Sequence, residues 1–82
     1  MFHKIESVIP KDNLIIEVVF DDKRIIQYDI KNIINKWKDF KNLEDKNLFK
    51  KVKVDAGGHG ISWNENIDIS AEEIWENGIK VK

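Results

Sequence analysis

Three of the four glycines of the chain stand within one stretch, Gly57-Gly58-His59-Gly60, and this stretch limits the fold more than any other. Glycine adopts positive φ angles without a steric cost and lets two backbone segments approach closely. Ile61-Ser62-Trp63 follows directly and reads as an extended segment. The stretch therefore predicts a tight turn or bulge that leads into a strand and points Trp63 into place.

Alternating and β-branched apolar residues predict the strands of an antiparallel sheet. The strands lie at residues 3–9, 14–20, 25–28, 52–54, 61–63 and 67–69, and residues 79–82 are either a frayed tail or a last edge strand. Pro10 closes the first strand and predicts that it lies at a sheet edge or end. The run 14–20 is apolar on both faces, which predicts a central strand with cover on each side. The charged link 21–24 predicts a hairpin whose loop is longer or bulged, because Lys23 disfavours the positive φ of a type I′ turn.

Helices are predicted between the strands. An N-cap at Asp29 precedes an apolar stripe at helical spacing, formed by Ile30, Ile33, Ile34 and Trp37. Asp45 caps a short turn, and Ser70 with Glu73 forms a capping box for a helix that ends at a left-handed Gly78. The predicted class is α+β: a small antiparallel sheet, an N-terminal three-stranded meander plus C-terminal strands, with two or three short helices packed on it.

The length of 82 residues predicts a single domain, residues 1–82, because so short a chain has no room for two cores. The chain has no cysteine, which excludes disulfides and thiol chemistry and fits a reducing cytoplasm. Its first residues do not resemble a signal peptide, and no apolar run reaches the roughly 18 residues of a membrane span. We therefore expect a cytoplasmic protein with no membrane association.

Charge is distributed unevenly along the chain, although the net charge is only −1. The segment 31–53 holds eight lysines against Asp39, Glu44 and Asp45, whereas the segments before and after it are acidic. A near-neutral total argues against broad affinity for nucleic acid or membranes. The basic segment could still attract an acidic partner locally, or its lysines simply solvate the surface.

The stretch Val52–Asn64, followed by Ile67–Ile74 and Glu76-Asn77-Gly78, resembles the small bacterial proteins grouped as domain of unknown function 2442. The resemblance extends to the N-terminal strands and to Tyr28-Asp29-Ile30. It implies a compact α+β domain of unestablished activity, sometimes followed by a helix-turn-helix, and often encoded beside another small protein. Such a pairing implies an antitoxin-like or regulatory role. This chain ends soon after Gly78, so we expect no appended DNA-binding motif.

The glycine turn is also the first candidate for a ligand site. The backbone N–H groups of Gly57, Gly58, His59 and Gly60 could cradle an anion, although the stretch matches no phosphate-loop motif and leads into a strand. His59 with Ser62 and Asp55 or Asp68 could be drawn as a hydrolytic triad, but a triad is defined by geometry and needs a water-excluding site. His3 and His59 lack the spacing of a zinc site. We expect no catalytic residue, metal or cofactor, and a structural turn.

Three tryptophans, Trp37, Trp63 and Trp75, are many for so small a core. They are either core anchors, as the stripe position of Trp37 suggests, or one of them lies exposed in a partner-binding hot spot. Trp75 and Trp63 are the stronger candidates for exposure, because Trp75 directly follows Ile74 and the two cannot share a narrow helix face.

From these features we expect a non-enzymatic module that binds a protein partner or forms a homo-oligomer. The alternatives are association with nucleic acid through residues 31–53, which we do not favour, and binding of a small molecule or anion at the Gly57–Gly60 turn.

Overall fold

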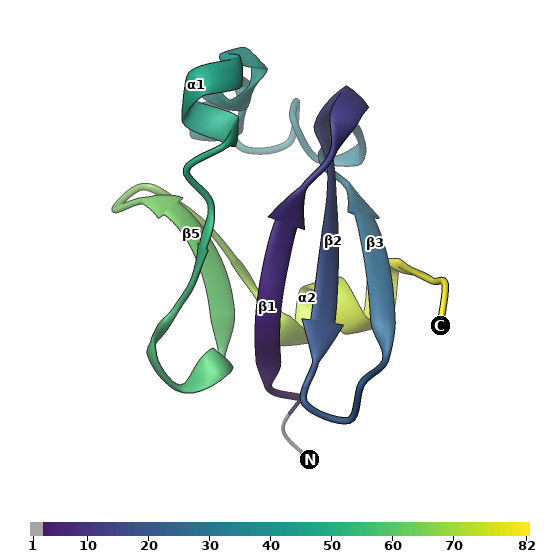
Figure 1. Ribbon diagram of the computed structural model, residues 1–82. Coiled ribbons are helices and arrows are strands. Elements are labelled where there is room, and N and C mark those ends of the chain that lie inside the picture. Colours follow the sequence, from purple (N-terminus) through teal and green to yellow (C-terminus); the bar gives the residue numbers. More distant parts are fainter. Residues whose placement is uncertain (1–2) are drawn as a thin grey trace.

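The computed structural model describes residues 3–82 and contains two antiparallel sheets (Figure 1). The larger sheet has the strand order β1-β2-β3-β7, with β1 at Ile5–Pro10, β2 at Ile15–Phe20, β3 at Ile25–Asp29 and β7 at Ile79–Lys80. The smaller sheet has the order β4-β5-β6, with β4 at Lys53–Val54, β5 at Gly60–Asn64 and β6 at Ile67–Ser70. The predicted α+β class is confirmed, with the strands divided between two sheets.

Short helices connect these strands. The α-helices are α1 at Lys46–Phe49 and α2 at Ala71–Asn77, and 3-10 turns occupy Asp12–Leu14, Ile30–Asn32, Lys38–Glu44 and Ala56–Gly58. In Figure 1, α2 lies behind the larger sheet, and it packs against β3, β5 and β6. The predicted capping aspartates are confirmed: the carboxylate of Asp29 accepts from the N–H of Lys31, and that of Asp45 from the N–H of Asn47.

One hydrophobic core joins both sheets and α2. Its fully buried members include Ile16, Val18, Ile26, Ile61, Ile67 and Ile74. Burying each such side chain stabilises the fold by about 1.5–3 kcal/mol. The smaller sheet and α2 therefore cover the same face of the larger sheet.

The central position predicted for β2 is confirmed, and β1 lies at a sheet edge. The expectation that both faces of β2 are covered is wrong. Ile16, Val18 and Phe20 are buried, whereas Ile15, Glu17 and Val19 on the other face are only half-buried. The reason is that α2 and the smaller sheet both pack on the first face.

The hairpin between β2 and β3 uses a bulged turn, one of the two predicted alternatives. The N–H of Lys23 donates to the Phe20 carbonyl at 2.9 Å, and Lys23 then takes a φ of 75°. A turn followed by a left-handed residue is the usual three-residue hairpin loop. The Lys23 ammonium lies 2.9 Å from the Glu6 carboxylate, so a surface ion pair accompanies the strained backbone.

The predicted amphipathic helix over residues 30–37 is wrong. Only Ile30–Asn32 forms a 3-10 turn, and Trp37 is extended, with φ −122° and ψ 126°. Ile30, Ile33 and Ile34 are nevertheless buried, as their spacing requires. The β-branched isoleucines and the asparagines of this stretch are weak helix formers, so packing against the core decides the local conformation.

Both ends of α2 differ in part from the prediction. The Ser70 hydroxyl accepts from the N–H of Glu73 at 3.1 Å, as a capping box requires, but the Glu73 carboxylate accepts from the Tyr28 hydroxyl at 2.8 Å. Gly78 ends the helix with a φ of −82°, so it is not left-handed. A Cβ there would lie 2.3 Å from Cγ2 of Ile26, and close packing explains the glycine. Residues beyond it form an edge strand, β7, which is one of the two predicted alternatives.

Candidate functional site

The three tryptophans have three different environments. Trp63 is only 5% exposed, and its indole N–H donates to the Phe49 carbonyl at 3.0 Å. The expectation that Trp63 could be exposed is therefore wrong, because its ring lies in the core beside Phe49, whose carbonyl accepts its hydrogen bond. Trp37 is instead the most exposed of the three, at 46%.

Trp75 is half-buried by a stack of side chains. The His3 ring lies parallel to it with ring centroids 3.7 Å apart, and the Phe20 ring meets it edge-on at 5.1 Å. The guanidinium of Arg24 and the ammonium of Lys80 lie 5.2 and 5.0 Å from its centroid, within the range of cation–π attraction. Trp75 thus joins α2 to the N-terminal segment, the β2–β3 hairpin and β7, which is a structural role.

An aromatic row connects the surface at Trp37 with the interior. Trp37 and Phe40 have ring centroids 5.1 Å apart, and Phe40 lies 6.3 Å from Trp63. Trp63 in turn stacks on Phe49 at 6.3 Å. Aromatic pairs at these separations attract one another beyond the area they bury. The row therefore holds Trp37 against a rigid base although half of its side chain is exposed.

Trp37 stands between two surface hollows. One, of about 480 Å³, is lined by Lys36–Phe40 with Asn66 and Asp68. The other, of about 370 Å³, is lined by Tyr28, Asn32, Ile33, Lys36, Trp37, Glu73 and Asn77. Burial, and then the hydrogen bond to Glu73, raises the pKa of Tyr28, so its hydroxyl is a fixed donor at neutral pH. An aromatic ridge flanked by two hollows is a shape that a partner protein can interleave with.

We call residues 30–53 the lysine-rich connection, because they link β3 to β4 and contain eight of the lysines. Lys31 lies 3.0 Å from the Asp29 carboxylate. Seven others are exposed, and within residues 3–82 no carboxylate forms a salt bridge with them: Lys36, Lys38, Lys41, Lys46, Lys50, Lys51 and Lys53. The positive charge of this segment is therefore left for solvent or a partner.

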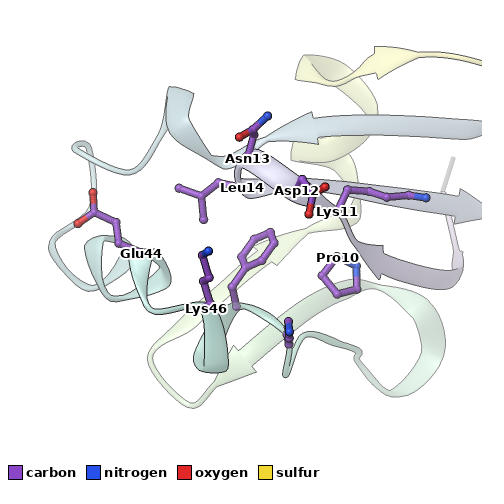
Figure 2. Close-up of a pocket in the computed structure, with 9 residues that line it drawn as sticks. Pro10, Lys11, Asp12, Asn13, Leu14, Glu44 and Lys46 are labelled. Atoms are coloured by element: carbon purple, nitrogen blue, oxygen red, sulfur yellow. The ribbon is translucent and has the colours of Figure 1, made fainter.

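A cleft of about 590 Å³ separates α1 from the turn after β1 (Figure 2). Pro10, Leu14 and Phe49 form its apolar lining, and its remaining residues are Lys11, Asp12, Asn13, Glu44, Lys46 and Lys50. Figure 2 shows Leu14 and Lys46 pointing toward each other across the cleft, whereas the Glu44 carboxylate points away. The cleft offers an apolar interior with an ammonium group at its mouth.

The wall of the cleft formed by residues 12–14 has an unusual backbone. Asn13 and Leu14 have φ angles of 61° and 59°, in the left-handed region. Leucine is disfavoured there by roughly 1–2 kcal/mol. The N–H of Lys11 donates to the Ile15 carbonyl at 2.7 Å, and the Lys31 ammonium donates to the Asn13 carbonyl, so contacts on both sides hold the turn. Alternation predicts that Leu14 begins the strand, but β2 begins at Ile15 and Leu14 belongs to the turn. The polar residues Lys11-Asp12-Asn13 predict the turn itself, without its extension to Leu14.

The local backbone structure explains each glycine of the turn. Gly57 and Gly58 have φ angles of 80° and 72°, and a Cβ on Gly58 would lie 2.7 Å from the Ile5 carbonyl oxygen. A Cβ on Gly60 would lie 2.6 Å from the Ile69 carbonyl oxygen. The predicted tight turn is confirmed, and it brings the edge of the smaller sheet against β1.

The carboxylate of Asp55 bears on both ligand hypotheses for this turn. The Ser62 hydroxyl donates to Oδ1 of Asp55 at 2.6 Å, and the N–H of Gly58 donates to the Asp55 carbonyl at 2.9 Å. The negative charge of Asp55 beside the turn repels an anion. The Gly58 N–H is already bonded to the Asp55 carbonyl and is not available to bind one. A serine that donates to a carboxylate is not placed as a nucleophile beside a histidine base. The geometry therefore favours a structural turn.

Metal ligands are not gathered in the part of the chain that the structure describes. No group of three or more His, Cys, Asp or Glu side chains that could hold a metal ion occurs within residues 3–82. Among the same residues, no helix is long and apolar enough to cross a membrane.

Comparison with known proteins identifies a family and a similar fold. A family model described as "Protein of unknown function (DUF2442)" matches residues 5–80. The structure resembles the "Crystal Structure of Putative DNA Binding Protein NE0471 from Nitrosomonas europaea ATCC 19718" with a TM-score of 0.78 and 16% sequence identity. The match covers 92% of this chain and 48% of that one, so this chain spans about half the length of its structural relative. No curated protein matches the sequence.

Proposed function

The chain belongs to the DUF2442 family of proteins of unknown function, and within that family we propose that it is a non-enzymatic module that binds a protein partner through the lysine-rich connection. The observation that carries the proposal is the 46% exposure of Trp37 between two hollows. Tryptophan is enriched among the residues that dominate binding energies, and an exposed one on a rigid base has little freedom left to lose on binding.

The partner we propose is acidic, because seven exposed lysines of the connection form no salt bridge with a carboxylate of residues 3–82. Opposite charge accelerates encounter and fixes the orientation of two proteins more than it adds affinity. Trp37 would then supply the apolar anchor, and the cleft at Leu14 a second place for an apolar side chain. We propose that the partner is the product of a neighbouring gene, which gives the module an antitoxin-like or regulatory role in the cytoplasm.

Calorimetric titration of the chain with each purified neighbouring gene product tests the proposal. Trp37→Ala should weaken binding by about thirtyfold, because central interface residues contribute roughly 2 kcal/mol or more. Ile79→Ala is a matched control that removes an exposed aliphatic side chain from β7, and it should leave binding unchanged. Binding that survives Trp37→Ala in full, or absence of binding to every neighbouring product, would contradict the proposal.

A second candidate function is association with DNA, which two observations support. The structural relative is named a "Putative DNA Binding Protein", and the connection presents lysines outside any salt bridge that could contact phosphates. The first proposal remains the stronger, because the connection has no arginine and the net charge of the chain is −1. Arginine is the residue that reads base edges most often.

Anisotropy of a labelled DNA duplex over a salt series tests this second function. Binding through Z phosphates should give a slope of about −0.9Z in log K against log salt concentration. Replacing Lys46, Lys50 and Lys51 together by alanine should flatten the slope, whereas Lys4→Ala outside the connection should not. A slope that the triple variant leaves unchanged would count against the connection as the DNA-binding surface.

A further inference from the structure

The larger sheet has one face that packs on the core and one that does not. Strand pairing defines the second, which we call the open sheet face. Ile9 lies opposite Glu17, Glu17 opposite Gln27, and Gln27 opposite Ile79. Val19 lies opposite Ser7 and Ile25, and the N–H of Val81 donates to the Ile25 carbonyl at 2.9 Å, so these four share a second row. In Figure 1 this face is turned toward the viewer, with α2 behind the sheet.

The open sheet face is aliphatic where a solvated face would be polar. Antiparallel sheets with one wet face normally alternate apolar residues inward and polar residues outward. Here six aliphatic side chains point outward: Ile9, Ile15, Val19, Ile25, Ile79 and Val81. The three at its margins, Ile9, Ile79 and Val81, are 44%, 69% and 48% exposed. No helix or strand of residues 3–82 packs on this side of the sheet in Figure 1.

The charges on this face are neutralised within the chain. The Glu17 carboxylate lies 3.6 Å from the Lys11 ammonium, and the Asp29 carboxylate lies 3.0 Å from that of Lys31. A charged partner therefore gains little here, in contrast to the lysine-rich connection. A face whose charges are paired and whose margins are aliphatic is complementary to another of the same kind.

The centre of the face is self-complementary in its hydrogen bonding. Nε2 of Gln27 donates to Oε1 of Glu17 at 3.5 Å, which uses one of the two N–H groups of the amide. In a two-fold dimer, each residue of one copy meets its own partner residue on the other. An axis between Glu17 and Gln27 would let the second N–H of each Gln27 donate to the Glu17 carboxylate of the other copy.

We propose that the open sheet face is a self-association surface, on which a second copy of this chain packs sheet to sheet about a two-fold axis near Glu17 and Gln27. Three strands about 4.8 Å apart and at most about 20 Å long, with the two-residue β7 beside them, present roughly 300 Å². This is less than half of the roughly 800 Å² per partner in a stable interface, so the dimer is weak and forms at high protein concentration. The proposal is independent of the function proposed for the connection.

Sedimentation equilibrium of the intact chain over a wide range of concentrations tests the proposal. The mass should rise from 9.7 kDa toward twice that value as concentration increases. Ile9→Lys combined with Ile79→Lys should weaken dimerisation at least tenfold, because both positions are exposed and charge there would be buried between the copies. Circular dichroism confirms that this variant is folded, and Trp37→Ala serves as the control that should dimerise like the natural chain.

Amide chemical shifts locate the contact independently of any variant. As the protein concentration is raised, the amide shifts of residues in β1, β2, β3 and β7 should change, whereas those of residues 36–51 should stay constant. A mass of 9.7 kDa at every concentration would overturn the proposal. So would dimerisation that the double lysine variant leaves intact, or one that Trp37→Ala abolishes.

Discussion

The two sheets with α2, here called the framework, differ from the lysine-rich connection in how their side chains are used. In the framework, Lys11, Lys23 and Arg24 lie 3.6, 2.9 and 3.4 Å from carboxylates, and two of the three tryptophans are covered. In the connection, seven lysines have no such partner within residues 3–82, and Trp37 is half exposed. Three basic side chains of the framework are thus paired within the chain, whereas the connection leaves seven lysines and an aromatic ring for contacts outside the chain.

This difference separates stability from binding along the sequence. The core side chains of the connection, such as Phe40 and Leu43, fix its path, while its surface contributes little to folding. Substitutions in the framework should therefore change the free energy of unfolding, and those on the surface of the connection should change binding. The following experiments test that separation, beginning with the largest expected effect.

Alanine substitution at two tryptophans, one in each region, tests the separation of stability from binding most directly. Trp63→Ala should lower the free energy of unfolding by about 3–5 kcal/mol, because it leaves a core cavity. It also leaves the Phe49 carbonyl without its donor. Trp37→Ala should cost about 1 kcal/mol or less, since its main aromatic contact is with Phe40. Urea denaturation measures both, and equal costs would erase the distinction between the two regions.

The glycine turn offers a second matched pair within the framework. Gly58→Ala should cost about 2–4 kcal/mol, because the alanine would take a positive φ and clash with the backbone of Ile5. Gly57→Ala should cost about 1–2 kcal/mol, since the alanine would also take a positive φ but its new Cβ would meet the His59 side chain and no backbone. Thermal unfolding of both variants shows which substitution lowers the stability more. A larger loss of stability for Gly57→Ala would contradict the role assigned to the close packing of Gly58 on β1.

Alkaline pH should act on the framework through Tyr28. Burial and the bond to Glu73 raise the pKa of this hydroxyl in the folded state. The unfolded state therefore loses the proton first, and the free energy of unfolding should fall as pH rises above about 10. Tyr28 is the chain's one tyrosine, so phenolate absorbance reports on it alone. Tyr28→Phe should remove this part of the pH dependence, and phenolate forming near pH 10 in the folded protein would contradict the prediction.

Charge reversal should give the smallest effects, of opposite sign in the two regions. Lys11→Glu should lower the free energy of unfolding by about 0.5–1 kcal/mol, because the pair with Glu17 becomes a repulsion. Lys50→Glu should raise it by about 0.3–0.5 kcal/mol, because Lys46 then has an acidic neighbour one turn away. Chemical denaturation at low and high salt measures both changes. If both substitutions changed the free energy of unfolding in the same direction, or if the changes persisted at high salt, the contrast in charge pairing between the two regions would be wrong.

Much of the framework could be predicted from the sequence because its signals are local. Alternation identified the strands, and Asp29, Asp45 and Ser70 each cap the residues that directly follow them. The extended path of Ile61–Trp63 also follows from residue type and spacing, whereas residues 79–82 are predicted as either a frayed tail or an edge strand. These elements depend on contacts within a few residues, which a sequence pattern records.

The connection and the cleft could not be predicted to the same extent. Helical spacing over residues 30–37 indicates which side chains are buried, and an irregular chain buries Ile30 and Ile33 equally well. Exposure of Trp37 depends on where Phe40 and Trp63 lie, and Gly78 is required by its contact with Ile26, which is distant in sequence. The left-handed Leu14 is held by contacts from its surroundings against its own preference. Each feature is set by tertiary contacts.

The place of β7 at the edge of the larger sheet has a consequence for biosynthesis. β3 is synthesised early, but Lys80, its outer neighbour, follows only after the smaller sheet and α2 have been synthesised. During translation, the edge of β3 and the side of Ile26 on which Gly78 later packs are both bare. Unpaired strand edges favour aggregation, so the β2–β3 hairpin is exposed to it until β7 pairs with β3.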